Sequence, residues 1–177
     1  MKTYEFTLVL SGFEELTDEL EDRLFEAGCD DAVLGIRDQT PYLDFDRESG
    51  SATEAVLSAI EAAERSGLGI EVRRVEPDDL VSAAEIGGRT GRSRESIRLL
   101  ATGKRGPGGF PRPVSGLKRR TRLWRWSEVA DWLSNHELAD ETAELELARA
   151  IAAVNGALDL RRSREVSGRD LLDRLVG

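Results

Sequence analysis

The sequence predicts an α+β fold in three parts, and three observations lead to this prediction. Up to residue 77, apolar residues recur with a period of two and then of three to four positions, as in strands and helices that follow one another. Residues 84–98 have the spacing of two short helices joined by a tight turn. Beyond residue 135, a long apolar stripe of helical spacing predicts C-terminal helices.

The first part, residues 1–77, is predicted to fold as one domain. Alternating apolar and polar residues predict four strands, over residues 3–10, 32–36, 42–46 and 69–75. Helical spacing predicts two helices, over residues 13–27 and 51–66, with Phe13 and Leu16 on the buried face of the first. The order β-α-β-β-α-β is that of a ferredoxin-like, split βαβ domain, in which both helices cover one face of an antiparallel sheet.

The last part, residues 136–177, is predicted to be a C-terminal helical segment. A helix is expected from Ala139 to Leu160, followed by a short helix over residues 170–176. The apolar stripe of the longer helix consists of Leu147, Ile151, Val154 and Leu158. Because this stripe is broad, the helix is also a candidate dimerisation surface. Acidic residues at its start and basic residues after its end would complement the helix dipole.

The middle part, residues 78–135, has the features of a helix-turn-helix. Ala84 is a small residue expected where the two helices touch. Gly91 falls at the turn, where a positive φ is required, and Ser93 is placed to cap the second helix. Gly87 and Gly88 stand where better helix formers are usual and would loosen the first helix by about 1 kcal/mol each.

Three motifs of this middle part carry a resemblance to a known family. They are A-E-I-x-x-x-x-G-x-S-x-x-x-I-R from Ala84, G-G-F-P-x-P-V from Gly108 and L-W-R-W-S-E-V-A-D-W-L from Leu123. Over residues 80–134 the sequence resembles the winged helix-turn-helix of prophage regulatory and excisionase-type proteins, which are relatives of the MerR-like superfamily. The resemblance implies a DNA-binding domain with a basic β-hairpin, the wing, and a tryptophan-containing helix that closes the core.

Carried onto this sequence, the resemblance implies a position for each part of the wing. Val114 would lie in its first strand and residues 122–126 would form its returning strand. Lys118, Arg119 and Arg120 would lie at or near its tip. Ser127 would cap the closing helix, and the long link over residues 103–109 is expected to be mobile until DNA is bound.

Positive charge is concentrated in the same part of the chain. Residues 81–134 hold 12 of the 25 Lys and Arg but 4 of the 34 Asp and Glu, a net charge of +8, whereas the rest carries −17. A basic segment in an acidic protein predicts contact with a polyanion, and we expect double-stranded DNA, with the N-terminal part of the second helix in the major groove. The residues expected to contact DNA are Arg92, Ser93, Arg94, Glu95, Arg98, Lys104, Arg105, Lys118, Arg119, Arg120 and Arg122.

These features predict a DNA-binding protein that is not an enzyme and that regulates transcription or a mobile element. A homodimer, or a protein partner held by the acidic first domain, is compatible with the sequence, and so is an antitoxin-like role. No cofactor or metal is expected, since Cys29 and His136 are the single residues of their types. The N-terminus lacks a signal-peptide pattern, and no apolar run reaches the roughly 18 residues of a membrane span, so a cytoplasmic location is expected.

Other interpretations remain open. The basic residues can form a solvated face that meets the acidic domain, which would then compete with DNA. A ferredoxin-like domain can host a metal-dependent nuclease or hydrolase with Asp44 and Asp46 as ligands, although alternating acidic residues on a wet strand face are ordinary. A non-catalytic adaptor for RNA or protein is a third interpretation. Trp124, Trp126 and Trp132 can stack on single-stranded bases, but core packing is favoured for at least two of them.

Overall fold

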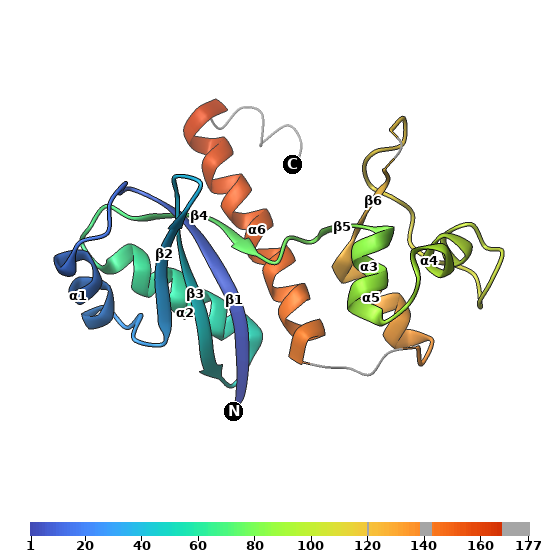
Figure 1. Ribbon diagram of the computed structural model, residues 1–177, viewed down its shortest axis with the longest axis horizontal. Coiled ribbons are helices and arrows are strands. Elements are labelled where there is room, and N and C mark those ends of the chain that lie inside the picture. Colours follow the sequence, from blue (N-terminus) through green and yellow to red (C-terminus); the bar gives the residue numbers. More distant parts are fainter. Residues whose placement is uncertain (120, 139–142, 168–177) are drawn as a thin grey trace. The chain divides into compact units, whose positions relative to one another are not determined.

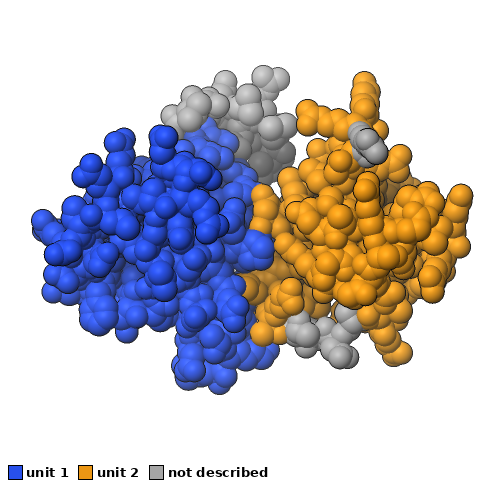
Figure 2. Space-filling model, viewed as in Figure 1, with its two compact units in different colours: residues 1–77, 150–177 blue, residues 78–149 orange. Residues whose placement is uncertain are grey.

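A computed structural model describes residues 1–119, 121–138 and 143–167 of the chain, which form the expected mixed α+β structure (Figure 1). The chain divides into two compact units, shown in different colours in Figure 2. Unit 1 comprises Met1–Pro77 and Ala150–Gly177, and unit 2 comprises Asp78–Arg149. The predicted C-terminal segment, residues 136–177, is therefore shared between the two units.

Unit 1 contains a four-stranded antiparallel sheet in the order β2-β3-β1-β4. Its first elements are β1 (Lys2–Ser11), α1 (Asp18–Glu26), β2 (Ala32–Arg37), β3 (Thr40–Ser49), α2 (Ala52–Arg65) and β4 (Glu71–Glu76). These elements confirm the predicted order of strands and helices. The predicted hairpin between β2 and β3 turns at Asp38 and Gln39, both of which have a positive φ.

One face of this sheet is buried, as the alternating pattern predicts. Four alternate residues of β1 are each 4% exposed or less: Tyr4, Phe6, Leu8 and Leu10. On β3, Arg47 lies on the buried side and donates hydrogen bonds to Asp31 through Nε (2.8 Å) and Nη2 (2.6 Å). Its Nη1 atom reaches the Ser58 hydroxyl of α2 (3.2 Å), so this helix lies over the buried face.

The first helix begins later than predicted. The Thr17 hydroxyl accepts a hydrogen bond from the Leu20 N–H (3.2 Å) and caps α1, which therefore starts at Asp18. Phe13 and Leu16 precede the helix, and Leu16 is 44% exposed. Their placement on the buried face of the helix was wrong, because the apolar spacing continues upstream through the capping residue.

The C-terminal helix, α6 (Ala143–Ser167), extends beyond the predicted end. Arg161 and Arg162, expected after the helix, lie within it, where Arg161 pairs with Glu64 and Arg162 with Asp159. The predicted start at Ala139 and the predicted short helix over residues 170–176 lie outside the described residues. Within the described ranges, no helix combines the length and apolar character needed to cross a bilayer.

The apolar stripe of α6 is buried inside the chain. Its four predicted members are each 8% exposed or less: Leu147, Ile151, Val154 and Leu158. The stripe is therefore not an exposed dimerisation surface, which corrects that expectation.

Helix α6 lies beside β4, a strand at one edge of the sheet (Figure 1). Side chains of α6 and α2 bond to the outer backbone groups of this strand. Asn155 accepts a hydrogen bond from the Val75 N–H (2.9 Å) and donates one to the Val75 carbonyl (2.8 Å). At Val72, Glu64 accepts from the N–H (3.0 Å) and Arg161 donates to the carbonyl (3.0 Å). Backbone groups that an edge strand normally leaves free are thus paired within the chain.

Unit 2 combines short helices with a two-stranded antiparallel sheet. Its elements are β5 (Leu80–Ser82), α3 (Ala83–Thr90), α4 (Arg94–Ala101), β6 (Leu123–Arg125) and α5 (Trp126–Asn135). The short strand β5 was not predicted, and it pairs with β6 so that Val81 lies opposite Trp124. The predicted first strand at Val114 is reduced to a single bridge between Ser115 and Leu123.

Candidate nucleic-acid interface

The turn between α3 and α4 is built from local hydrogen bonds. Ser82 and Glu85 form a reciprocal capping box at the start of α3, which lowers the pKa of Glu85 through its bonds to Ser82. Gly91 ends α3 in the left-handed conformation with a φ of 65°. The Ser93 hydroxyl accepts a hydrogen bond from the Ser96 N–H (3.1 Å) and caps α4. The predicted roles of Gly91 in the turn and of Ser93 as a cap are confirmed.

Gly87, and not Ala84, allows α3 to approach the turn. Ala84 is exposed, which corrects its predicted position at the helix contact. Gly87 is buried, its carbonyl accepts from the Arg92 N–H (2.9 Å), and a Cβ built on it would lie 2.5 Å from the Arg92 carbonyl oxygen. Gly88 has open space around it. The prediction that both glycines merely weaken the helix was therefore wrong for Gly87.

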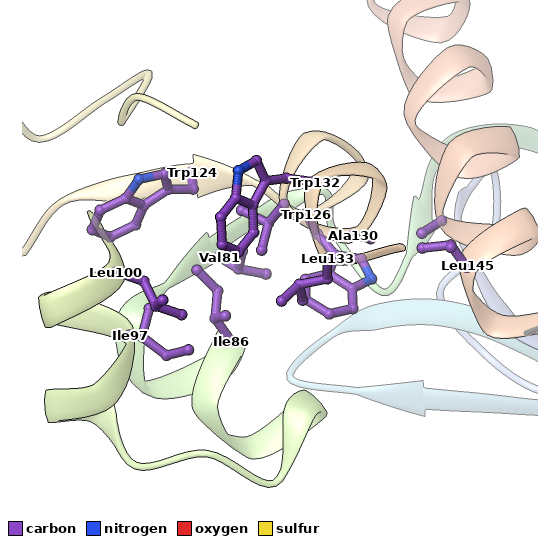
Figure 3. Close-up of a cluster of buried hydrophobic side chains, with 12 residues drawn as sticks. Val81, Ile86, Ile97, Leu100, Trp124, Trp126, Ala130, Trp132, Leu133 and Leu145 are labelled. Atoms are coloured by element: carbon purple, nitrogen blue, oxygen red, sulfur yellow. The ribbon is translucent and has the colours of Figure 1, made fainter. Parts of the chain in front are cut away.

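A buried apolar cluster holds α3, α4 and β6 together (Figure 3). Ile97 and Leu100 of α4 pack in the same cluster as Ile86 of α3, as their helical spacing predicts. The cluster also contains Val81 of β5 and Leu145 of α6. Ile97 and Leu100 anchor α4 in this cluster, while Arg94 and Arg98 of the same helix are exposed to solvent.

All three tryptophans belong to this core. Trp124, Trp126 and Trp132 are 5%, 7% and 7% exposed, so the expected core packing is confirmed for each. The Trp124 indole donates to the Pro111 carbonyl (3.1 Å) and the Trp132 indole to the Gly108 carbonyl (3.1 Å). The link over residues 103–109, expected to be mobile, is thus held at its C-terminal end.

Asp79 caps the start of α5 from 48 positions earlier in the chain. Its carboxylate is 5% exposed and accepts a hydrogen bond from the Ser127 N–H (2.8 Å), and it also pairs with Arg125 (3.1 Å). Its backbone carbonyl accepts from the Trp126 N–H (2.6 Å). Ser127 lies inside α5, so its predicted capping role was wrong.

We expect Asp79→Ala to lower the free energy of unfolding of unit 2 by about 2 kcal/mol, because the partly buried Ser127 N–H loses its acceptor and Arg125 loses its partner. Urea denaturation followed by tryptophan fluorescence measures this, since all three tryptophans lie in unit 2. Asp78→Ala is the matched control, because the Asp78 carboxylate accepts from the Leu80 N–H (3.1 Å) at an exposed site. Equal losses in the two variants would contradict the capping role.

Four arginines line one concave surface of unit 2, here called the arginine concavity. It has a volume of about 520 Å³ and lies between the start of α3, α4 and the segment of residues 116–122, here called the basic loop. α4 contributes Arg94 and Arg98, and the basic loop contributes Arg119 and Arg122. Ala84 and Thr102 are among its other lining residues, and none of the described lining residues is acidic. The fold thus brings together two cation pairs that are about 25 positions apart in the sequence.

The four arginines differ in whether they form an ion pair. Within the described part of the chain, Arg94, Arg119 and Arg122 form no ion pair. Arg98 donates to Glu95 through Nε (2.8 Å) and Nη2 (2.6 Å). This hydrogen bond holds the pKa of the Glu95 carboxyl below its ordinary value and raises the pKa of Arg98. Glu95 therefore orients Arg98, while the other arginines are available to an anion.

The remaining residues expected to contact DNA lie outside the lining of the arginine concavity. Arg92 donates to the Leu138 carbonyl at 3.5 Å, and Ser93 is engaged as the cap of α4. Lys104, Arg105 and Lys118 are exposed. Arg120 lies outside the described residues.

The candidate metal ligands of unit 1 are Asp44 and Asp46. In the ranges that the structure describes, no group of three or more His, Cys, Asp or Glu side chains is placed to hold a metal ion. Asp44 accepts a hydrogen bond from the Thr7 hydroxyl (2.5 Å), and Asp46 lies opposite Glu5 in the neighbouring strand. Burial raises the pKa of the Cys29 thiol to about 11, so this thiol stays protonated at neutral pH.

Comparison with known proteins found no match for the chain among protein-family models, curated proteins or solved structures.

Proposed function

We propose that the chain is a sequence-specific DNA-binding protein, a small regulator of transcription or of a mobile element. The observation that carries the proposal is the arginine concavity, in which a helix and a loop present Arg94, Arg98, Arg119 and Arg122 to solvent, with Arg98 oriented by Glu95. Duplex DNA is a rigid polyanion with grooves that admit a helix, and it matches a surface of this kind.

In this proposal unit 2 is a winged helix-turn-helix. The order α3, tight turn, α4 and basic loop supports this arrangement, as does the short sheet of β5 and β6 beneath the loop. α4 would enter the major groove, where Arg94 and Arg98 reach guanine edges or phosphates. Arg119, Arg122 and the exposed Lys118 would hold the backbone beside it.

Unit 1 would serve as a partner, dimerisation or ligand module. The strand order β2-β3-β1-β4, with antiparallel neighbours throughout, supports the ferredoxin-like arrangement. Unit 1 holds 12 Lys and Arg but 23 Asp and Glu, and this net charge of −11 would favour a basic protein partner for the module.

A salt titration against duplex DNA, single-stranded DNA and RNA tests the function. If the four arginines each neutralise one phosphate, log Kobs for a duplex falls by about 4 for each tenfold rise in salt. We expect the duplex to bind most tightly, with some sequences preferred in a selection from a random pool. Equal binding to all three nucleic acids, or no binding of duplex at low salt, would overturn the proposal.

A further inference from the structure

The basic loop carries an exposed leucine at its tip. The Arg119 N–H donates to the Gly116 carbonyl (2.9 Å), which closes a turn with Leu117 and Lys118 at its two central positions. The side chain of Leu117 is 69% exposed. The apolar core of unit 2 closes without it, since Leu117 is not among the residues of the buried cluster.

The described residues around this leucine are cationic. Lys118, Arg119 and Arg122 are exposed in the same loop. The loop is closed at its base by hydrogen bonds from the Val114 N–H to the Leu123 carbonyl (2.8 Å) and from the Leu123 N–H to the Ser115 carbonyl (3.1 Å). A single exposed leucine is ordinary on a protein surface. The distinguishing feature of Leu117 is its central position in the turn that Gly116 and Arg119 close, next to exposed cations that attract phosphates.

Resting on the DNA-binding function proposed above, we infer that Leu117 inserts between two base pairs from the minor groove and bends the duplex. Apolar side chains placed in this way partly unstack a base step and kink DNA by about 20–90°. The neighbouring cations would hold the phosphates on the two sides of the groove and so offset part of the unstacking cost. Arg119 and Arg122 line the same concavity as α4, so α4 and the tip would act on adjacent grooves of one duplex.

Energy transfer between dyes at the two ends of a duplex measures this bend. The probe is a duplex of about 30 base pairs recovered from the random pool with the wild-type protein, a length suited to bending measurements. We expect saturation with the wild-type protein to raise the transfer efficiency. We expect Leu117→Ala to bind the same duplex and to lose most of that rise. Leu117→Met, which keeps an apolar side chain of similar size, should retain it.

Val114→Ala is the matched control, because Val114 is also an exposed apolar residue of this region (46%) but lies at the base of the loop. It should leave the bend unchanged. A duplex that stays straight with the wild-type protein, or one that Leu117→Ala bends equally, would overturn the inference while leaving DNA binding intact. Absence of any duplex binding by the wild-type protein would instead overturn the proposed function. Because Leu117 is exposed, its variants should keep the urea midpoint of the parent, which confirms that they are folded.

Discussion

Gly87→Ala is expected to lower the free energy of unfolding of unit 2 by about 3 kcal/mol, the upper range for forcing an extra methyl into a packed site. The added Cβ would lie 2.5 Å from the Arg92 carbonyl oxygen, a backbone atom that a rotamer change cannot move. Relief requires α3 to shift away from the turn, which breaks the hydrogen bond from the Arg92 N–H to the Gly87 carbonyl. Urea denaturation followed by tryptophan fluorescence measures the loss.

Gly88→Ala is the matched control in the adjacent position. A Cβ on Gly88 meets nothing within 4 Å, so alanine there should raise stability by about 0.5–1 kcal/mol through its better helix propensity. The changes in the free energy of unfolding caused by alanine at Gly87 and at Gly88 are therefore expected to have opposite signs. If both substitutions stabilise unit 2, the close approach of α3 to the turn is wrong.

Arg94→Ala is expected to weaken binding to the preferred duplex by about 10- to 100-fold, the range for losing one good contact to a base edge. Arg94 has no ion-pair partner in the described residues, lines the arginine concavity and stands in the first turn of α4. Fluorescence anisotropy with preferred and scrambled duplexes would show a smaller difference between the two sequences in the variant.

Two further variants test whether the position of a positive charge, and not only the net charge, determines binding in this experiment. Lys118→Ala should weaken both duplexes alike and reduce the salt slope by about 1, as the loss of a phosphate contact does. Arg112→Ala removes the same charge at an exposed site outside the arginine concavity and should have the smallest effect. An Arg112→Ala loss equal to that of Arg94→Ala would mean that net charge alone determines binding.

The fold of unit 1 could be predicted because its patterns are local. Each strand has one buried face, so period two appears in β1 and β3, and α2 carries its apolar residues at helical spacing between Ser51 and Gly67. The start of α1 was missed because the apolar residues keep their helical spacing upstream of Thr17, although the helix begins only after this capping residue. The edge contacts of Asn155 and Arg161 with β4 join residues about 80–90 positions apart, and no local pattern contains them.

In unit 2 the sequence indicated the turn, the second helix and the gathering of cations, because a glycine, a capping serine and charge density are local signals. The role of Gly87 could not be read in this way, since a glycine that allows close approach looks like one that weakens a helix. Asp79 was missed because its partner, the Ser127 N–H, is distant in sequence. The ion pair of Glu95 and Arg98 follows from their three-residue spacing, which places both on one helix face.

The pairing of Val72 and Val75 with side chains has a consequence for self-association. With β4 blocked, the sheet of unit 1 can be lengthened only past β2 at its opposite end. If two copies joined through their β2 strands, the two outer edges of the joined sheet would both be β4 strands. Their backbone groups are already paired with side chains, so a third chain could not add a strand there. If copies of the chain paired through this sheet, strand addition would therefore end at two chains and would not build filaments.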